Sequence, residues 1–184
     1  MKEASPVDRQ ARFEEMYREY EQRLLGYALR RAPVEQAKDA VAEAFLAAWR
    51  RLDDVPAEPL PWLIGATRKT LANHRRASAR QLGVAQRLGA EPAAPSSEAQ
   101  PADDAGAIRA ALTALAPNDR EALTLIAWEE LTPSAAARAL HCSPVAFRVR
   151  LHRARRRFAA ALAAQERDTP PDARVDARTL EEMS

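Results

Sequence analysis

The chain has 184 residues, of which 47% are hydrophobic and 29% charged, with a formal net charge of +2. This composition excludes wholesale disorder, because it supplies enough apolar surface for a core. Cys142 is the only cysteine, so an intramolecular disulfide is excluded and a zinc site would have to rest on histidines and carboxylates. The N-terminus is charged and lacks the apolar stretch that a signal peptide contains, and no uncharged apolar run of about 18 residues occurs in the sequence. These features predict a cytoplasmic protein.

Apolar residues recur at three- and four-residue spacing in the first 84 residues, which predicts helices. The first helix begins at Ser5-Pro6, an N-cap followed by a proline at the first helical position, and Pro33 interrupts it. The second ends at residues 53–56 and has four apolar residues on one face: Val41, Phe45, Trp49 and Leu52. The third begins near Pro61, and its later part has a flank of basic residues with no acid among them: Arg68, Lys69, His74, Arg75, Arg76 and Arg80.

The composition changes between the two helical parts of the chain. Residues 85–106 are rich in Pro, Ala, Ser and acidic residues and lose helical periodicity, which predicts a flexible acidic linker. Residues 165–184 mix charges around two prolines, and we expect a disordered tail there. The chain is therefore predicted to hold two small domains, at 5–84 and 107–164.

The C-terminal part resembles a helix-turn-helix. Thr132-Pro133 and Ser143-Pro144 are both N-cap and proline pairs, and an alanine-rich helix of about two turns lies between them. A very short turn at His141-Cys142 then leads into a longer basic helix, which is the usual order of a helix-turn-helix. No sustained alternation of apolar and polar residues and no hairpin dipeptide occurs, so the fold class is predicted to be all-α.

The last helix combines an apolar stripe with a basic remainder. The stripe expected in the core consists of Phe147, Leu151, Ala154, Phe158 and Leu162. No carboxylate occurs from Ser143 to Ala164, and the basic residues are Arg148, Arg150, His152, Arg153, Arg155, Arg156 and Arg157. Guanidinium groups suit phosphates and guanine edges because they donate two parallel hydrogen bonds. The alternative is a solvated basic face without a ligand.

Five segments resemble the extracytoplasmic-function type of bacterial RNA polymerase sigma factors. Residues 143–155, SPVAFRVRLHRAR, are similar to the helix that recognises the -35 promoter element, and residues 115–120 and 131–134 match the preceding helices of the same domain. Residues 38–49, KDAVAEAFLAAW, resemble the helix that docks on the polymerase clamp. Residues 61–76, PWLIGATRKTLANHRR, resemble the segment that opens and recognises the -10 element.

The resemblance implies two all-α domains, a sigma region 2-like bundle and a sigma region 4-like helix-turn-helix. Its partners would be core RNA polymerase, through the clamp of the largest subunit, and promoter DNA, double-stranded at -35 and single-stranded at -10; an anti-sigma factor is a further partner that the family allows. The implied polymerase-binding residues are Asp39 and Glu43. The implied -10 residues are Trp62, Arg68, Lys69, Asn73, His74, Arg75 and Arg76. The implied -35 residues are Ser143, Val145, Ala146, Arg148, Val149, Arg150, His152, Arg153, Arg155 and Arg156.

The sequence departs from the family pattern at several positions. Val145 and Ala146 replace the usual Gly-Thr, and His141 stands where glycine usually forms the turn. Lys69 replaces an asparagine associated with the flipped -10 base, and Ala42 replaces a common glutamine. These positions leave open how the chain selects its promoter bases.

Two other classes of function were weighed against a sigma factor. A stand-alone helix-turn-helix regulator would bind DNA without polymerase, and an interaction protein would bind a partner helix through alanine-rich faces. An enzyme is not expected, because the acidic pairs Asp53-Asp54 and Asp103-Asp104 lack a nucleophile or phosphate loop nearby. We expect no cofactor and no metal, and aromatic residues such as Trp49 are expected in helix cores; Trp62 fits either a core or a base contact.

Overall fold

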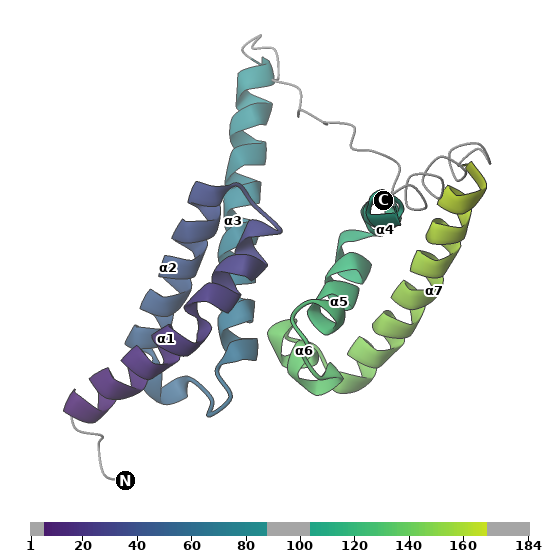
Figure 1. Cartoon of the computed structure of the whole chain (residues 1–184). Coiled ribbons are helices and arrows are strands. Elements are labelled where there is room, and N and C mark those ends of the chain that lie inside the picture. The colour runs from purple at the N-terminus through teal and green to yellow at the C-terminus, as the bar shows by residue number, and fades with distance from the viewer. Residues whose placement is uncertain (1–5, 88–103, 169–184) are drawn as a thin grey trace, which may run out of the picture. The chain divides into compact units, whose positions relative to one another are not determined.

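The computed structural model describes residues 6–87 and 104–168, and within these ranges every regular element is a helix (Figure 1). The elements are α1 (Pro6–Leu29), α2 (Val34–Arg50), the 3-10 helix η1 (Leu52–Asp54), α3 (Leu60–Arg87), α4 (Asp104–Ala114), α5 (Pro117–Ala127), α6 (Pro133–Ala139) and α7 (Pro144–Asp168). The all-α prediction is confirmed for the described part of the chain. None of its helices combines the length and the apolar character that a membrane span requires.

The residue contacts divide the chain into two compact units. One unit comprises Met1–Ala94 with Glu129–Pro144 and holds α1, α2, η1, α3 and α6. The other comprises Pro95–Trp128 with Val145–Ser184 and holds α4, α5 and nearly all of α7. The predicted division at 5–84 and 107–164 follows chain order and stays a prediction. Most of the predicted linker and tail lies outside the described residues.

The first unit is built on the mutual packing of α1, α2 and α3. The buried face of α2 is mostly alanine, with Val41 and Phe45 as its larger members. Small residues allow neighbouring helix backbones to approach closely, and Leu24, Tyr27, Leu63 and Ile64 fill the core between them. This packing places exposed residues of α2 and α3 on adjoining surfaces.

The second helix ends two residues before the last position of its predicted apolar face. It ends at Arg50, and Leu52 lies in η1, where its side chain is still buried. The backbone of Arg51 is no longer helical, with a φ of −123° and a ψ of 34°, so the chain turns before Leu52. The prediction that Leu52 belongs to the core is confirmed, but its assignment to the second helix is wrong.

A buried carboxylate stabilises the first unit around α6. Glu129 is only 1% exposed, and its Oε1 lies 2.5 Å from an Arg30 nitrogen and 3.8 Å from an Arg31 nitrogen. The Arg31 guanidinium in turn lies 3.7 Å from the centre of the Tyr27 ring. A buried charge is tolerated only where it is paired, and the two arginines directly after α1 provide that compensation.

The second unit is held together by arginine side chains. Arg120 on α5 donates to the carbonyl oxygens of Leu112 at 2.7 Å, Thr113 at 2.6 Å and Leu115 at 3.2 Å. Carbonyls at the end of a helix lack partners within that helix, so Arg120 supplies donors around the C-terminus of α4. Arg120 therefore has a structural role in the second unit.

Candidate nucleic-acid interface

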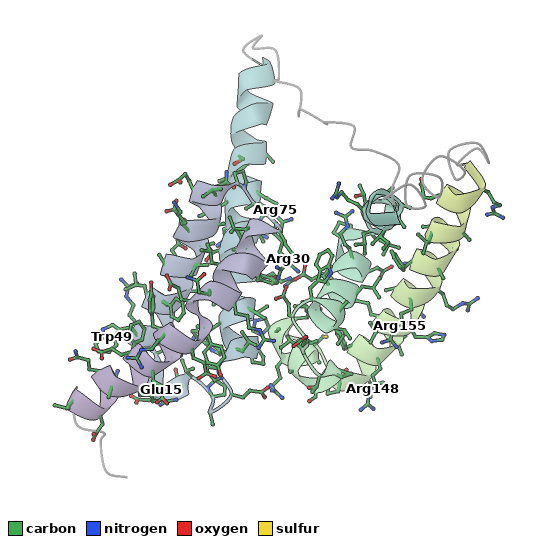
Figure 2. The ribbon with its side chains drawn as sticks, in the orientation of Figure 1. Glu15, Arg30, Trp49, Arg75, Arg148 and Arg155 are labelled. Atoms are coloured by element: carbon green, nitrogen blue, oxygen red, sulfur yellow. The ribbon has the colours of Figure 1, made fainter. Side chains whose placement is uncertain are left out.

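The exposed side of α7 is basic over about three turns from its N-terminus. Phe147, Leu151 and Ala154 are buried as predicted, whereas Phe158 and Leu162 are only half-buried. All the predicted -35 residues are exposed except Arg150, which is half-buried: Ser143, Val145, Ala146, Arg148, Val149, His152, Arg153, Arg155 and Arg156. Figure 2 shows Arg148 nearer than Arg155 to the start of the helix. The arrangement is suited to contact with a polyanion along the helix.

The turn before α7 has the geometry that the sequence predicts. The Thr132 side chain accepts a hydrogen bond from the Ala135 amide at 3.2 Å and so caps α6. The His141 amide donates to Arg138 and the Cys142 amide to Ala137, at 3.1 and 3.0 Å. His141 has a φ of 51°, the left-handed conformation that glycine usually supplies at such a turn. Histidine therefore forms this turn without glycine.

One arginine of the basic remainder is committed to folding. Arg157 donates a hydrogen bond to the carboxylate of Asp119, which is buried on α5. At about 100° per residue, Arg157 and Arg150 lie on the edge of α7 next to its buried face, whereas Arg156 points away from that face. Sequence spacing alone could not reveal this pair, because its partners are 38 residues apart.

The basic flank of α3 is divided between two faces of the helix. Trp62, Lys69 and Asn73 line one pocket of about 620 Å³ with residues of α2, and His141 also contributes to its wall. Arg68 and Arg75 lie roughly 130° around the helix from these three residues and do not line the pocket. Arg76 donates to the Asn73 side chain at 2.6 Å, which connects it to the pocket face. Trp62 is half-buried, so the tryptophan is accessible from the pocket.

The two predicted polymerase-binding residues have different surroundings. Asp39 is exposed on α2. One carboxylate oxygen of Glu43 accepts a hydrogen bond from the Thr70 hydroxyl at 3.1 Å, and the other lies 3.9 Å from Nε2 of His74. The Glu43 side chain is nevertheless 59% exposed. Sequence analysis did not identify Thr70 as a neighbour of Glu43, because the packing of α2 on α3 brings them together.

Aromatic residues of α1 and α2 form a groove rather than a closed core. Phe13, Tyr17, Phe45 and Trp49 contact one another in tilted and edge-to-face arrangements, with ring centres 4.7 to 6.3 Å apart, and line a cavity of about 720 Å³. Trp49 is 40% exposed although its indole packs on the Phe13 ring, so its assignment to a helix core is wrong. The Glu21 carboxylate accepts a hydrogen bond from the Tyr17 hydroxyl at 2.9 Å, and this bond raises the pKa of the phenol.

The described residues contain no group of three or more His, Cys, Asp and Glu side chains that could hold a metal ion. Cys142 is a half-buried free thiol in the turn before α7. The charged clusters found above consist of arginines facing solvent or paired with single carboxylates.

Comparison with known proteins shows that two segments of the chain match known protein families. The family described as Sigma-70 region 2 matches residues 16–81, and Sigma-70, region 4 matches residues 105–158. A curated relative, the probable RNA polymerase sigma factor RfaY of Xanthomonas campestris pv. campestris, is 34% identical over 131 residues. That match covers 66% of this chain and 33% of the relative, so the chain spans about a third of the relative's length.

Two solved structures have the same fold. The sigma factor RpoE, in complex with the anti-sigma factor NepR from Bartonella quintana, superposes with a TM-score of 0.62 and 22% identity over 82% of this chain and 96% of that chain. CnrH, in complex with the cytosolic domain of CnrY, gives a TM-score of 0.59 and 24% identity over 87% of this chain and 91% of that chain. The resemblance seen in the sequence motifs is confirmed, and the chain belongs to the sigma-70 family of RNA polymerase sigma factors, within its extracytoplasmic-function type.

Proposed function

We propose that this chain binds core RNA polymerase and directs promoter-specific initiation of transcription as a non-catalytic subunit. The observation that carries the proposal is the presence of both sigma regions, in family order, each with an exposed face of matching chemistry. The catalytic residues and metals of transcription would belong to the polymerase. The stand-alone regulator weighed above has no use for the region 2 segment, so it explains less of the chain.

Polymerase binding is assigned to the exposed surface of α2. Asp39 and Glu43 lie one turn apart, with Leu46 also exposed further along the helix. Carboxylates around an apolar side chain suit a basic partner surface, because charge steers the encounter and apolar contact holds it. The complementary residues would lie on the clamp of the largest polymerase subunit.

Recognition of the opened -10 strand is assigned to the pocket face of α3. Trp62 offers an aromatic surface for stacking, and Lys69 and Asn73 offer donors next to it. His74 and Arg76 lie near this face through their contacts with Glu43 and Asn73. Arg68 and Arg75, on the other face, would contact the phosphates of DNA entering from that side. Unstacking a base costs a few kcal/mol, which stacking and phosphate contacts of this kind can offset.

Recognition of the -35 duplex is assigned to the first turns of α7. Val145 is 69% exposed at the start of the helix, and Ala146 and Val149 are exposed nearby. Exposed apolar side chains on a basic helix suit the methyl group of thymine in the major groove, whereas Arg148 suits a guanine edge. Arg153, Arg155 and Arg156 would hold phosphates, with Arg150, His152 and Ser143 completing the contact surface.

An anti-sigma factor completes the proposed set of partners, because the RpoE structure with the same fold is a complex with one. In the groove of Phe13, Tyr17, Phe45 and Trp49, the Tyr17 and Trp49 side chains offer exposed aromatic surface of the kind that protein interfaces bury. Its binding would compete with polymerase if it covered α2.

The experiment that tests the proposed function is co-purification with core polymerase followed by run-off transcription and mapping of the start sites. Asp39→Lys should abolish co-purification while helicity is unchanged. It is a cleaner test than reversal of both acids, because Glu43 also contacts α3. Glu15→Lys, an exposed reversal on α1 shown in Figure 2, is the matched control and should co-purify normally. Wild-type yields of the Asp39 variant would refute the assignment of this surface.

A further inference from the structure

Glu43 on α2 is bonded to the helix that carries the proposed -10 residues. Its carboxylate accepts the Thr70 hydroxyl at 3.1 Å, and Thr70 is buried. The second oxygen lies 3.9 Å from His74. Thr70 and His74 are one turn apart on α3, so a single carboxylate contacts two successive turns of that helix.

The two residues of the Thr70 contact both line the pocket between α2 and α3. Glu43, Thr70, Lys69, Asn73 and Trp62 all contribute to its wall. Lys69 directly precedes Thr70 in the chain, and Asn73 directly precedes His74. The hydrogen bond to Thr70 therefore ties the turn of α3 that carries Lys69 to α2, and the His74 side chain next to Asn73 lies close to the same carboxylate.

The pocket wall also carries basic and aromatic side chains. The other charged residues of the wall besides Glu43 are basic and include Arg50, Arg51 and Lys69. Basic side chains would attract the phosphates of a bound strand, and the half-buried Trp62 offers an aromatic surface to an extruded nucleobase.

We propose that Glu43 is a positioning residue for recognition of the -10 strand, acting through Thr70 and His74, in addition to its place on the polymerase-binding surface. This inference rests on the proposed function. It gives Glu43 two roles that can be separated, because its contact with Thr70 is internal to the protein and its exposed remainder faces a partner. A hydrogen bond from the buried Thr70 hydroxyl to the Glu43 carboxylate is charge-assisted, and such bonds fix the position of nearby binding residues.

Thr70→Val is the variant that isolates the positioning role, because it removes the hydroxyl and keeps the side-chain shape. Thr67→Val is the matched control: Thr67 is buried on the same helix, but its hydroxyl donates to the Leu63 carbonyl at 3.0 Å and not to α2. Thr70→Ser should restore the bond to Glu43. Glu43→Gln keeps an acceptor for Thr70 and removes the charge offered to the polymerase.

The measurement uses the full-length chain with core polymerase of the host bacterium. Holoenzyme affinity is measured by titration, and base preference is measured by transcribing a promoter library randomised at the -10 positions with saturating holoenzyme. Thr70→Val should keep core affinity within about twofold, lower transcription from the preferred -10 sequence roughly tenfold and flatten the preference, as expected for the loss of a hydrogen bond to a charged group. Thr70→Ser and Thr67→Val should match the wild type. Glu43→Gln should weaken core affinity yet keep the -10 preference at saturation.

The possible results separate this inference from the proposed function. A Thr70→Val holoenzyme with the wild-type -10 profile overturns the positioning role while the proposed function stands. Equal loss of core affinity in Thr70→Val and Glu43→Gln, with no change in preference, also overturns it, because the bond would then serve polymerase binding alone. A wild-type chain that gives no promoter-specific transcript overturns the proposed function, and the inference with it.

Discussion

Arg157 of α7 donates a hydrogen bond to the carboxylate of Asp119, three residues into α5. The Asp119 residue is 7% exposed, whereas the Arg157 side chain extends toward solvent. The contact connects the two helices, and the carboxylate in the first turn of α5 also favours that helix through its dipole. Arg157 is thus the member of the basic run whose first task is folding.

Removing either partner of this pair is expected to destabilise the second unit. Asp119→Ala should lower the free energy of unfolding by about 1–3 kcal/mol, because it removes both the pair and the charge at the helix start. Arg157→Ala should cost a similar amount, about 1–3 kcal/mol, because it removes the cation paired with the buried Asp119 carboxylate. Hydrogen exchange of the α5 and α7 amides in the full chain measures the effect where it arises.

The comparison with a neighbouring arginine distinguishes folding from DNA binding. Arg156 is exposed and directly precedes Arg157 in the sequence, and Arg156→Ala should leave the hydrogen exchange of the α5 amides unchanged. Equal exchange in the Arg156→Ala and Arg157→Ala proteins would contradict the assignment of Arg157 to folding.

The sequence predicts the helices well because their cores repeat at helical spacing. Phe147, Leu151 and Ala154 are buried as their spacing indicates. The same spacing misassigns Trp49, because periodicity gives the face of a helix and not how completely another helix covers it.

The contacts that shape the candidate site could not be predicted in this way. Glu43 and Thr70 are 27 residues apart, and each belongs to a different helix. A basic run such as residues 68–76 also gives no indication of which members face a pocket until the neighbouring helix is placed. Family resemblance identifies the functional segments, but the pairing of side chains across helices comes from tertiary packing.

Two non-glycine residues have a left-handed backbone conformation, and replacing one of them with glycine is expected to stabilise the folded protein. Glu130 has a φ of 53° and His141 a φ of 51°. Such conformations cost an L-residue of order 1–3 kcal/mol, whereas glycine adopts them without a Cβ clash and loses part of the gain to its freer unfolded chain. Glu130→Gly should therefore raise the free energy of unfolding by about 0.5–1 kcal/mol in urea denaturation.

Glu130→Ala separates backbone strain from side-chain loss. Alanine removes the exposed carboxylate but keeps the Cβ, so this variant should gain no stability. If the alanine and glycine proteins are stabilised equally, the gain comes from removing the charge and the strain argument fails.

The last prediction concerns which arginines of α7 recognise bases and which hold phosphates. Arg148 and Arg156 are both exposed and are separated by eight residues, about 12 Å along the helix. Arg148 lies one turn past the helix start, where a recognition helix enters the major groove, whereas Arg156 lies where such a helix approaches the backbone. Base contacts set specificity, and phosphate contacts set affinity and its dependence on salt.

Arg148→Ala is expected to cost about 1–3 kcal/mol on the preferred -35 sequence and to flatten discrimination at one or two base positions. Arg156→Ala should weaken all sequences about equally and reduce the slope of log affinity against log salt by about one. Binding curves at three salt concentrations on matched and mismatched -35 duplexes measure both effects. If Arg148→Ala lowers affinity uniformly while Arg156→Ala changes base preference, α7 enters the groove in the opposite orientation, with its later turns at the bases and its start at the phosphates.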